Sequence, residues 1–196
     1  MYALFDPQAF LGRLRAASQP MHDRLDAMID PGGLTSRQAY RDFLLANYPA
    51  LAGAENGLES GGVEMSFPDW STRRRSEALA ADLSDMGVGW RTLPPPHHAP
   101  VAYGRAAQTG QLYVLEGSRL GAAHILHRMA ASGGGLPTRF LRHGQHEGHW
   151  RSFQKRVAEF DISAAEANEA ESAAKMIFGL FVTAFERVYA GEKVAR

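Results

Sequence analysis

The chain has 196 residues, with 21 Lys or Arg, 21 Asp or Glu, a formal net charge of zero and no cysteine. The neutral balance argues against bulk nucleic-acid binding, and the absence of cysteine excludes disulfides, thiolate metal sites and thiol nucleophiles. No apolar run approaches the roughly 18 residues of a membrane-spanning helix, and no export signal is visible. We therefore expect one soluble, cytoplasmic domain over residues 1–196.

Helical periodicity dominates the chain, and no segment alternates convincingly as a β-strand would. The first helix is expected over residues 7–29. Either it kinks at Pro20, or it restarts there with Ser18 as the N-cap. The second helix is expected over residues 35–58, opening with a capping-box pattern and bending at Pro49.

The remaining helices alternate with glycine- and proline-rich connections. Helical segments are expected at residues 71–86, at a long stretch ending near 131, and at 138–143, 147–160 and 163–189. The last of these opens with a second capping-box pattern. The pattern predicts a single all-α domain of about six to eight helices.

Two glycines stand four residues apart inside the long helix that ends near residue 131. Gly117 and Gly121 share one face of the segment Tyr-Val-Leu-Glu-Gly-Ser-Arg-Leu-Gly-Ala-Ala, residues 113–123. Each costs a helix interior about 1 kcal/mol relative to alanine. Their common face indicates that something approaches the backbone closely there, either another helix or a flat ligand.

His22 is the most informative of the eight histidines. Asp26 lies four residues on, so its carboxylate can accept a hydrogen bond from one ring nitrogen while the other nitrogen binds iron or zinc. Arg15 lies two turns earlier on the same face and can pair with an anionic group of a ligand. The alternative is an exposed helix with a His–Asp pair and a nearby cation.

Other candidate groups also have two interpretations. His143, His146 and His149 recur every third residue, which suits either a metal cluster or a polar surface turn interrupted by glycines. Arg151 and Lys155, four apart, form either a clamp for two carboxylates or a solvated face.

Aromatic and charged runs extend these alternatives. The aromatic side of the last helix, formed by Phe178, Phe181 and Phe185, suits core packing or the wall of a flat apolar ligand. The run Arg73-Arg74-Arg75 is expected on the surface, where it would form a docking patch. His124 and His127 are expected to be partly buried polar residues or to face solvent.

Taken together, these segments resemble the heme oxygenase family, in particular its bacterial, biliverdin-producing and phytochrome-associated branch. Leu14-Arg15-Ala16-Ala17-Ser18, followed by His22 and Asp26, resembles the family's proximal helix. Residues 113–121 closely resemble its distal helix. Trp150-Arg151-Ser152-Phe153 and the phenylalanine-rich last helix follow in the family's order, so the resemblance covers nearly the whole chain.

The resemblance implies a helical bundle with heme between the proximal and distal helices, and it assigns roles to individual residues. His22 would be the axial iron ligand and Asp26 its hydrogen-bond partner. The remaining assignments are Arg15, Arg151 and Lys155 at the heme propionates, Gly117, Ser118 and Gly121 on the distal side, and Tyr113, Phe178 and Phe185 bordering the ring.

The implied activity is cleavage of heme by O2 to biliverdin, carbon monoxide and ferrous iron. Electrons would come from a ferredoxin or a separate reductase, and a phytochrome would accept the biliverdin. Ser118 stands where many relatives carry aspartate, and Arg119 is bulkier than the small residue common in bacterial relatives. The alternatives are a non-catalytic heme carrier or sensor on the same fold, and a helical protein that binds zinc through His143, His146 and His149.

Overall fold

The computed structural model describes residues 5–29, 34, 36–130 and 135–190. These residues form helices and connections, with no strand among them, which confirms the all-α prediction. Two 3-10 helices, η2 (Val63–Met65) and η3 (Trp90–Thr92), accompany the α-helices. The α-helices are α1 (Pro7–Met28), α2 (Arg37–Ser60), α3 (Trp70–Arg73), α4 (Ser76–Asp85), α5 (Gly104–Ala130), α6 (Arg139–Arg142), α7 (His149–Ala158) and α8 (Ala164–Tyr189).

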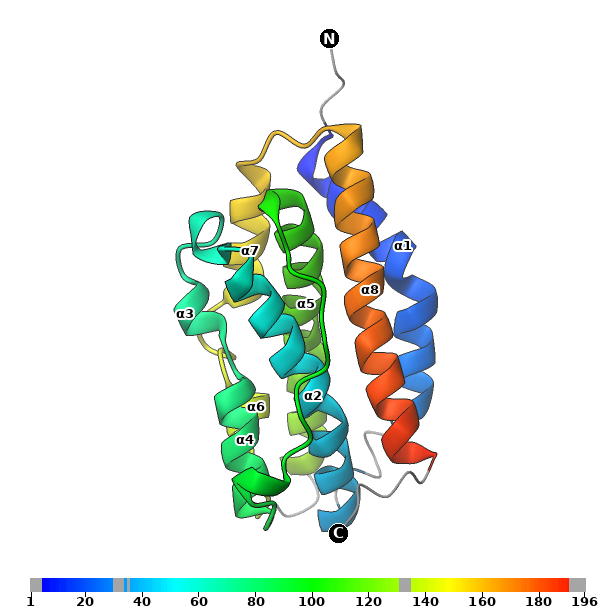
Figure 1. The fold of residues 1–196 in the computed structure, drawn as a ribbon, viewed down its shortest axis with the longest axis vertical. Helices are drawn as coiled ribbons and strands as arrows, with labels where there is room; N and C mark the ends of the chain where they lie inside the picture. Colours follow the sequence, from blue (N-terminus) through cyan, green and yellow to red (C-terminus); the bar gives the residue numbers. More distant parts are fainter. Residues whose placement is uncertain (1–4, 30–33, 35, 131–134, 191–196) are drawn as a thin grey trace.

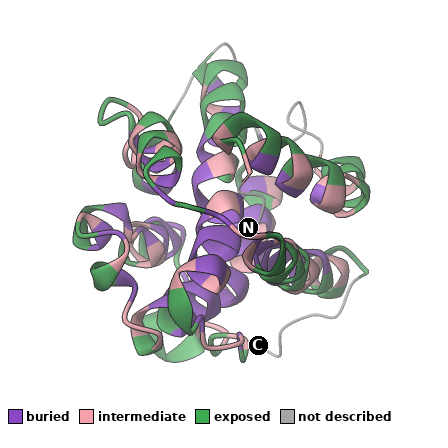
Figure 2. Ribbon diagram, turned by 90° about the horizontal axis from the view of Figure 1, so that it is seen from above, coloured by how far each residue is buried: buried purple, intermediate pink, exposed green. Residues whose placement is uncertain are grey.

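The four long helices α1, α2, α5 and α8 run along the long axis of the molecule, and α8 packs against each of the other three (Figure 1). Helices α6 and α7 pack on α5, and α4 packs on α2 and α6. Buried surfaces turn toward the centre when the bundle is seen along this axis (Figure 2). Helices α1 and α5 thus flank α8, and each contacts α8 far more than it contacts the other.

Helix α1 continues through Pro20, so the predicted restart at Ser18 is wrong. The N-cap is Asp6, whose Oδ1 accepts hydrogen bonds from the first turn. Ser18 is buried and donates to the Leu14 carbonyl at 2.8 Å, so its hydroxyl bonds to the preceding turn and is not free to cap a new helix. Such back-bonding slightly destabilises a helix and often bends it.

The other predicted helix starts are close to those observed. Ser36 is the N-cap of α2 and accepts from the Ala39 amide at 3.1 Å; Thr35, part of the expected capping pattern, lies outside the described residues. The capping box at α8 is confirmed, because the side chains of Ser163 and Glu166 each bond the other's backbone amide.

The single helix expected over residues 71–86 is wrong, because the chain breaks between α3 and α4. Arg74 is extended, with φ −59° and ψ 137°. The buried Glu55 carboxylate accepts hydrogen bonds from the amides of Arg75, at 2.8 Å, and Ser76. A side chain of α2 therefore supplies the cap that the local sequence lacks.

The long connection before α5 lies against a glycine stripe on α2. A β-carbon at Gly53 would lie 2.2 Å from the His97 carbonyl oxygen, and one at Gly61 would lie 2.0 Å from that of Ala102. The His97 amide also donates to the Pro49 carbonyl at 2.8 Å. The protein's own packing therefore requires glycine at these positions, because a larger residue would overlap the backbone of the connection.

Candidate functional site

His22 lies on α1 with its ring directed toward α8. Its Nδ1 is 3.1 Å from Asp26 Oδ2, and its ring centroid is 6.0 Å from that of Phe178. The side chain is 51% exposed. With Nδ1 engaged by the carboxylate, Nε2 is the ring nitrogen available to a metal.

The aromatic residues of α8 fall into two groups. Phe178 and Phe181 are buried but for a few per cent of their surface, and Phe178 contacts His22 of α1. Phe185, predicted to border a heme, packs on Phe43 of α2, with ring centroids 5.9 Å apart. The part of α8 nearest His22 is therefore lined by Phe178, whereas Phe185 lies in the core toward α2.

No neighbouring helix explains Gly117 and Gly121 of α5. A β-carbon at Gly117 would meet the Trp150 ring at 3.9 Å, an ordinary contact, and no described atom outside α5 lies within 4 Å of one at Gly121. Gly110 on the same helix is different, because its β-carbon would lie 2.0 Å from the Ala170 carbonyl oxygen of α8. Close packing of another helix therefore does not account for these two glycines, whereas it does account for Gly110.

Tyr113 lies where α5 comes near α1. Its ring packs edge-on against Trp150, with centroids 5.9 Å apart. Burial raises the pKa of Tyr113, while a hydrogen bond to Ser18 and the charge of Arg15 oppose that rise. Arg15 of α1 and Trp150 of α7 therefore both act on one α5 side chain.

The three cations predicted to pair with an anionic ligand lie on two helices. Arg15 on α1 and Arg151 and Lys155 on α7 are exposed, and none of them forms an ion pair with a described residue. Arg151 directly follows Trp150, whose ring contacts Tyr113. The predicted clamp of Arg151 and Lys155 thus lies on α7, and Arg15 lies on α1.

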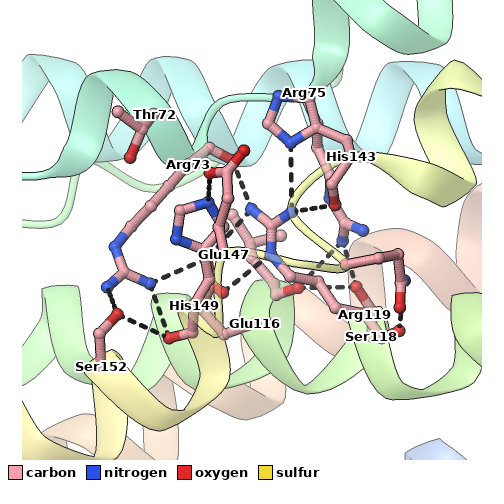
Figure 3. Close-up of polar contacts among 12 residues, drawn as sticks. Thr72, Arg73, Arg75, Glu116, Ser118, Arg119, His143, Glu147, His149 and Ser152 are labelled. Atoms are coloured by element: carbon pink, nitrogen blue, oxygen red, sulfur yellow. Dashed lines mark hydrogen bonds and ion pairs between the residues drawn. The ribbon is translucent and has the colours of Figure 1, made fainter.

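The arginine run before α4 is not the surface patch that the sequence predicts. Arg73 and Arg75 are only 2% and 3% exposed. Arg73 pairs with Asp69 at 2.7 Å. It also pairs with the buried Glu116 of α5 at 3.3 Å, and both residues are labelled in Figure 3. These carboxylates offset the cost of burying the charge, and Glu116 comes from a distant part of the sequence.

Arg119 also turns into the protein, away from the glycine face. It pairs with Glu116 at 2.8 Å and donates to the carbonyls of Arg73, at 2.6 Å, and His143, at 2.8 Å (Figure 3). Its bulk therefore does not enter the space beside Gly121.

Arg75 holds the same turn of α5 from behind. It donates to the Leu115 carbonyl at 2.9 Å and to the Ser118 hydroxyl. Complete burial, and then the nearby Arg119, lower the pKa of Arg75 to about 9. The Ser118 hydroxyl donates in turn to Leu115 at 2.7 Å, so its hydrogen-bonding capacity is directed away from the glycine face.

The three clustered histidines do not form a metal site. His143 and His146 lie in the turn between α6 and α7, where Gly144 and Gly148 have φ values of 73° and 65°, and His149 is the first residue of α7. His149 is buried beside Glu147 and His143 contacts Arg119. No group of three potential metal ligands occurs among the described residues, which contradicts the zinc alternative.

Sequence reasoning missed the buried partners in this region, above all Glu116 and the contact of Trp150 with Gly117. One signal for Glu116 was available: a carboxylate inside an apolar stretch of α5, with Arg119 three residues later. No comparable local signal marks Trp150, because its neighbours Tyr113 and Gly117 belong to another helix.

The sequence of this chain is similar to known proteins of one family. A family model described as Heme oxygenase matches residues 8–187. The chain is 32% identical to Heme oxygenase of Xanthomonas campestris pv. campestris over 155 residues, 77% of this chain and 91% of that protein. It is 28% identical to Heme oxygenase PigA of Pseudomonas aeruginosa over 188 residues, 91% of this chain and 92% of that protein.

Two solved structures share the fold. The NO- and CO-bound heme oxygenase from Neisseria meningitidis has a TM-score of 0.74 at 21% identity and covers 92% of both chains. Heme oxygenase from Leptospira interrogans has a TM-score of 0.68 at 18% identity, with 91% of this chain and 98% of that one covered. Separately, no helix in the described part of the chain is long and apolar enough to span a membrane.

Proposed function

The chain belongs to the heme oxygenase family, and we propose that it cleaves heme with O2 and reductant to biliverdin, carbon monoxide and ferrous iron. Bound heme would supply the iron that reacts with O2 and the ring carbon that is removed. The chain's own residues would ligate the iron, orient the ring and keep bulk solvent from its faces. We assign these tasks residue by residue.

One observation carries the proposal: Gly117 and Gly121 are glycines that the protein's own packing does not require. A glycine that costs helix stability and is not closely packed by the protein itself fits a position where a ligand touches the backbone. The exposed Leu120 adjoins them, with 57% of its surface free in the absence of a ligand. This side of α5 suits the face of a flat, apolar ring.

His22 is the proposed iron ligand. Its Nδ1–H would donate to Asp26, which fixes the tautomer and leaves the Nε2 lone pair for the iron. The bond to a carboxylate also makes the imidazole a better donor. Phe178, packed edge-on against His22, would hold the ring from the α8 side and exclude water.

The cations Arg15, Arg151 and Lys155 would pair with the two heme carboxylates. Arg15 of α1 acts on Tyr113 through its charge, and Arg151 of α7 follows Trp150, whose ring contacts Tyr113. Charge-assisted bonds from both helices would fix which edge of the ring points toward solvent.

The proton needed on the distal side would not come directly from Ser118 as the structure stands. Its hydroxyl donates to the Leu115 carbonyl and accepts from Arg75. Between Gly117 and Gly121, ordered water would therefore carry the protons on the distal side. We propose that Ser118 acts through the position of the helix and not as an acid.

Two protein partners complete the proposal, and both rest on the resemblance to the bacterial branch. A ferredoxin or a separate reductase would supply electrons. A phytochrome would accept biliverdin as its chromophore, and we place the protein in the cytoplasm with that partner. Residues 1–196 would act as a single domain.

Reconstitution tests the proposal. Adding heme should produce a Soret band, and adding ascorbate or a ferredoxin system in air should bleach the band and yield biliverdin. A Soret band with no bilin would instead identify a heme carrier or sensor. His22→Ala should lose the stable complex; unchanged heme affinity and turnover in that variant would contradict the assigned ligand.

A further inference from the structure

Trp150 is the large side chain beside the glycine face that the proposed function leaves without a role. It lies in the first turn of α7 and is partly buried. Its ring stacks on Phe153, with centroids 5.6 Å apart and planes inclined by 28°, and meets Tyr113 edge-on. Phe153 is fully buried, so the indole is fixed on its inner side by the core.

The outer edge of this indole reaches α5 at Gly117. Its Cζ3 lies 3.9 Å from the position of a β-carbon there, whereas one turn later no described atom outside α5 lies within 4 Å of such a position at Gly121. The glycine face of α5 therefore has the indole beside it at Gly117 and no described neighbour from outside α5 at Gly121. A flat ligand that touches both glycines would meet the indole at the Gly117 end.

The cations near Trp150 indicate which edge of a ligand would lie next to the indole. Arg151 is the next residue, and Arg15 acts on Tyr113, which contacts the indole. A porphyrin carries its two carboxylates on one edge, and this edge would lie near Arg15 and Arg151. The packed indole would lie at the same end of the glycine face. It would therefore limit both translation of the heme along α5 and rotation of the heme in its own plane.

We propose that Trp150 is a specificity-determining residue, which fixes the in-plane orientation of the heme and thereby selects the meso carbon that lies over the backbone of α5. This inference rests on the proposed function and adds the product isomer to it. Cations alone leave the ring free to turn by small angles, because Arg and Lys side chains are long and flexible. A packed indole does not move in this way.

The test compares Trp150→Ala and Trp150→Phe with the natural protein, all loaded with heme. Bilin isomers are separated by chromatography after turnover. Independently of turnover, the heme methyl shifts of the ferric cyanide complex are recorded by proton NMR, since they report the in-plane orientation. Trp90→Ala is the matched control, because Trp90 is 76% exposed and outside the site.

We expect the natural protein and Trp90→Ala to give one dominant isomer and one set of methyl shifts. In Trp150→Ala, selectivity for that isomer should fall roughly ten-fold or more, with a second set of shifts. Trp150→Phe should lie between them, and it keeps the test valid if the alanine variant does not fold.

Unchanged isomer and unchanged methyl shifts in the folded Trp150 variants would overturn this inference while leaving the proposed function intact. A natural protein that binds no heme would instead remove the proposed function, and the inference with it.

Discussion

Replacing Gly121 by alanine should change protein stability and heme affinity in opposite directions. In the protein without ligand, no described atom outside α5 lies within 4 Å of the added β-carbon. The substitution should therefore raise the free energy of unfolding by about 1 kcal/mol and the Tm by roughly 2–4 °C. With heme, the same methyl group would enter the space of the ring, at a cost of about 1–3 kcal/mol, or roughly 5- to 150-fold in Kd.

Two matched variants make this prediction specific. Gly12→Ala on α1 also meets no described atom, so it should stabilise the protein by a similar amount and leave heme affinity unchanged. Gly110→Ala should destabilise it, because the methyl group would lie 2.0 Å from the Ala170 carbonyl. Thermal unfolding and Soret titration measure both quantities. A Gly121→Ala protein that is less stable without ligand, or that binds heme as tightly as before, would refute the reasoning.

The other predictions concern the charges behind α5. Glu116→Gln should lower the free energy of unfolding by about 3–5 kcal/mol, because Arg73 and Arg119 would lose their buried counter-charge. Denaturant titration should show this loss. As a control, Glu77→Gln at an exposed position should change the free energy of unfolding by less than about 1 kcal/mol. Ser118→Ala should lower stability by about 1–3 kcal/mol, since Arg75 loses an acceptor, and should leave the bilin isomer unchanged; a new isomer in chromatography would assign Ser118 a direct distal role. Burial, and then the charges of Arg119 and Arg75, lower the pKa of His143 below 6.5 in the folded protein. As the pH falls, the unfolded chain therefore takes up this proton before the folded chain does. The free energy of unfolding should consequently fall as the pH drops below about 6.5. His143→Gln should reduce that slope in unfolding measured between about pH 5 and 7.5, and an unchanged slope would show that His143 is not its source.

Local signals in the sequence predicted the parts of the site that lie on one helix. His22 and Asp26 pair as their spacing indicates, and the α8 capping box forms as its sequence predicts. The glycine face was recognised from its cost to the helix. Its meaning stayed open until the structure showed which glycines touch another helix and which do not.

Contacts between distant segments account for what the sequence did not predict. The run of three arginines has the composition of a solvated face, and Arg73 is buried because Asp69 and Glu116 meet it there. The break between α3 and α4 depends on Glu55 of α2, about 20 residues earlier. Neither partner can be identified from the local pattern, since helix packing alone brings them together.

Iron coordination in the heme complex tests the central claim most directly. Resonance Raman spectra of the ferrous complex should show an iron–imidazole stretch in the natural protein. That band should disappear in His22→Ala and return when free imidazole is added. A stretch that persists unchanged in His22→Ala would show that another residue holds the iron, and would contradict a site built between His22 and the glycine face of α5.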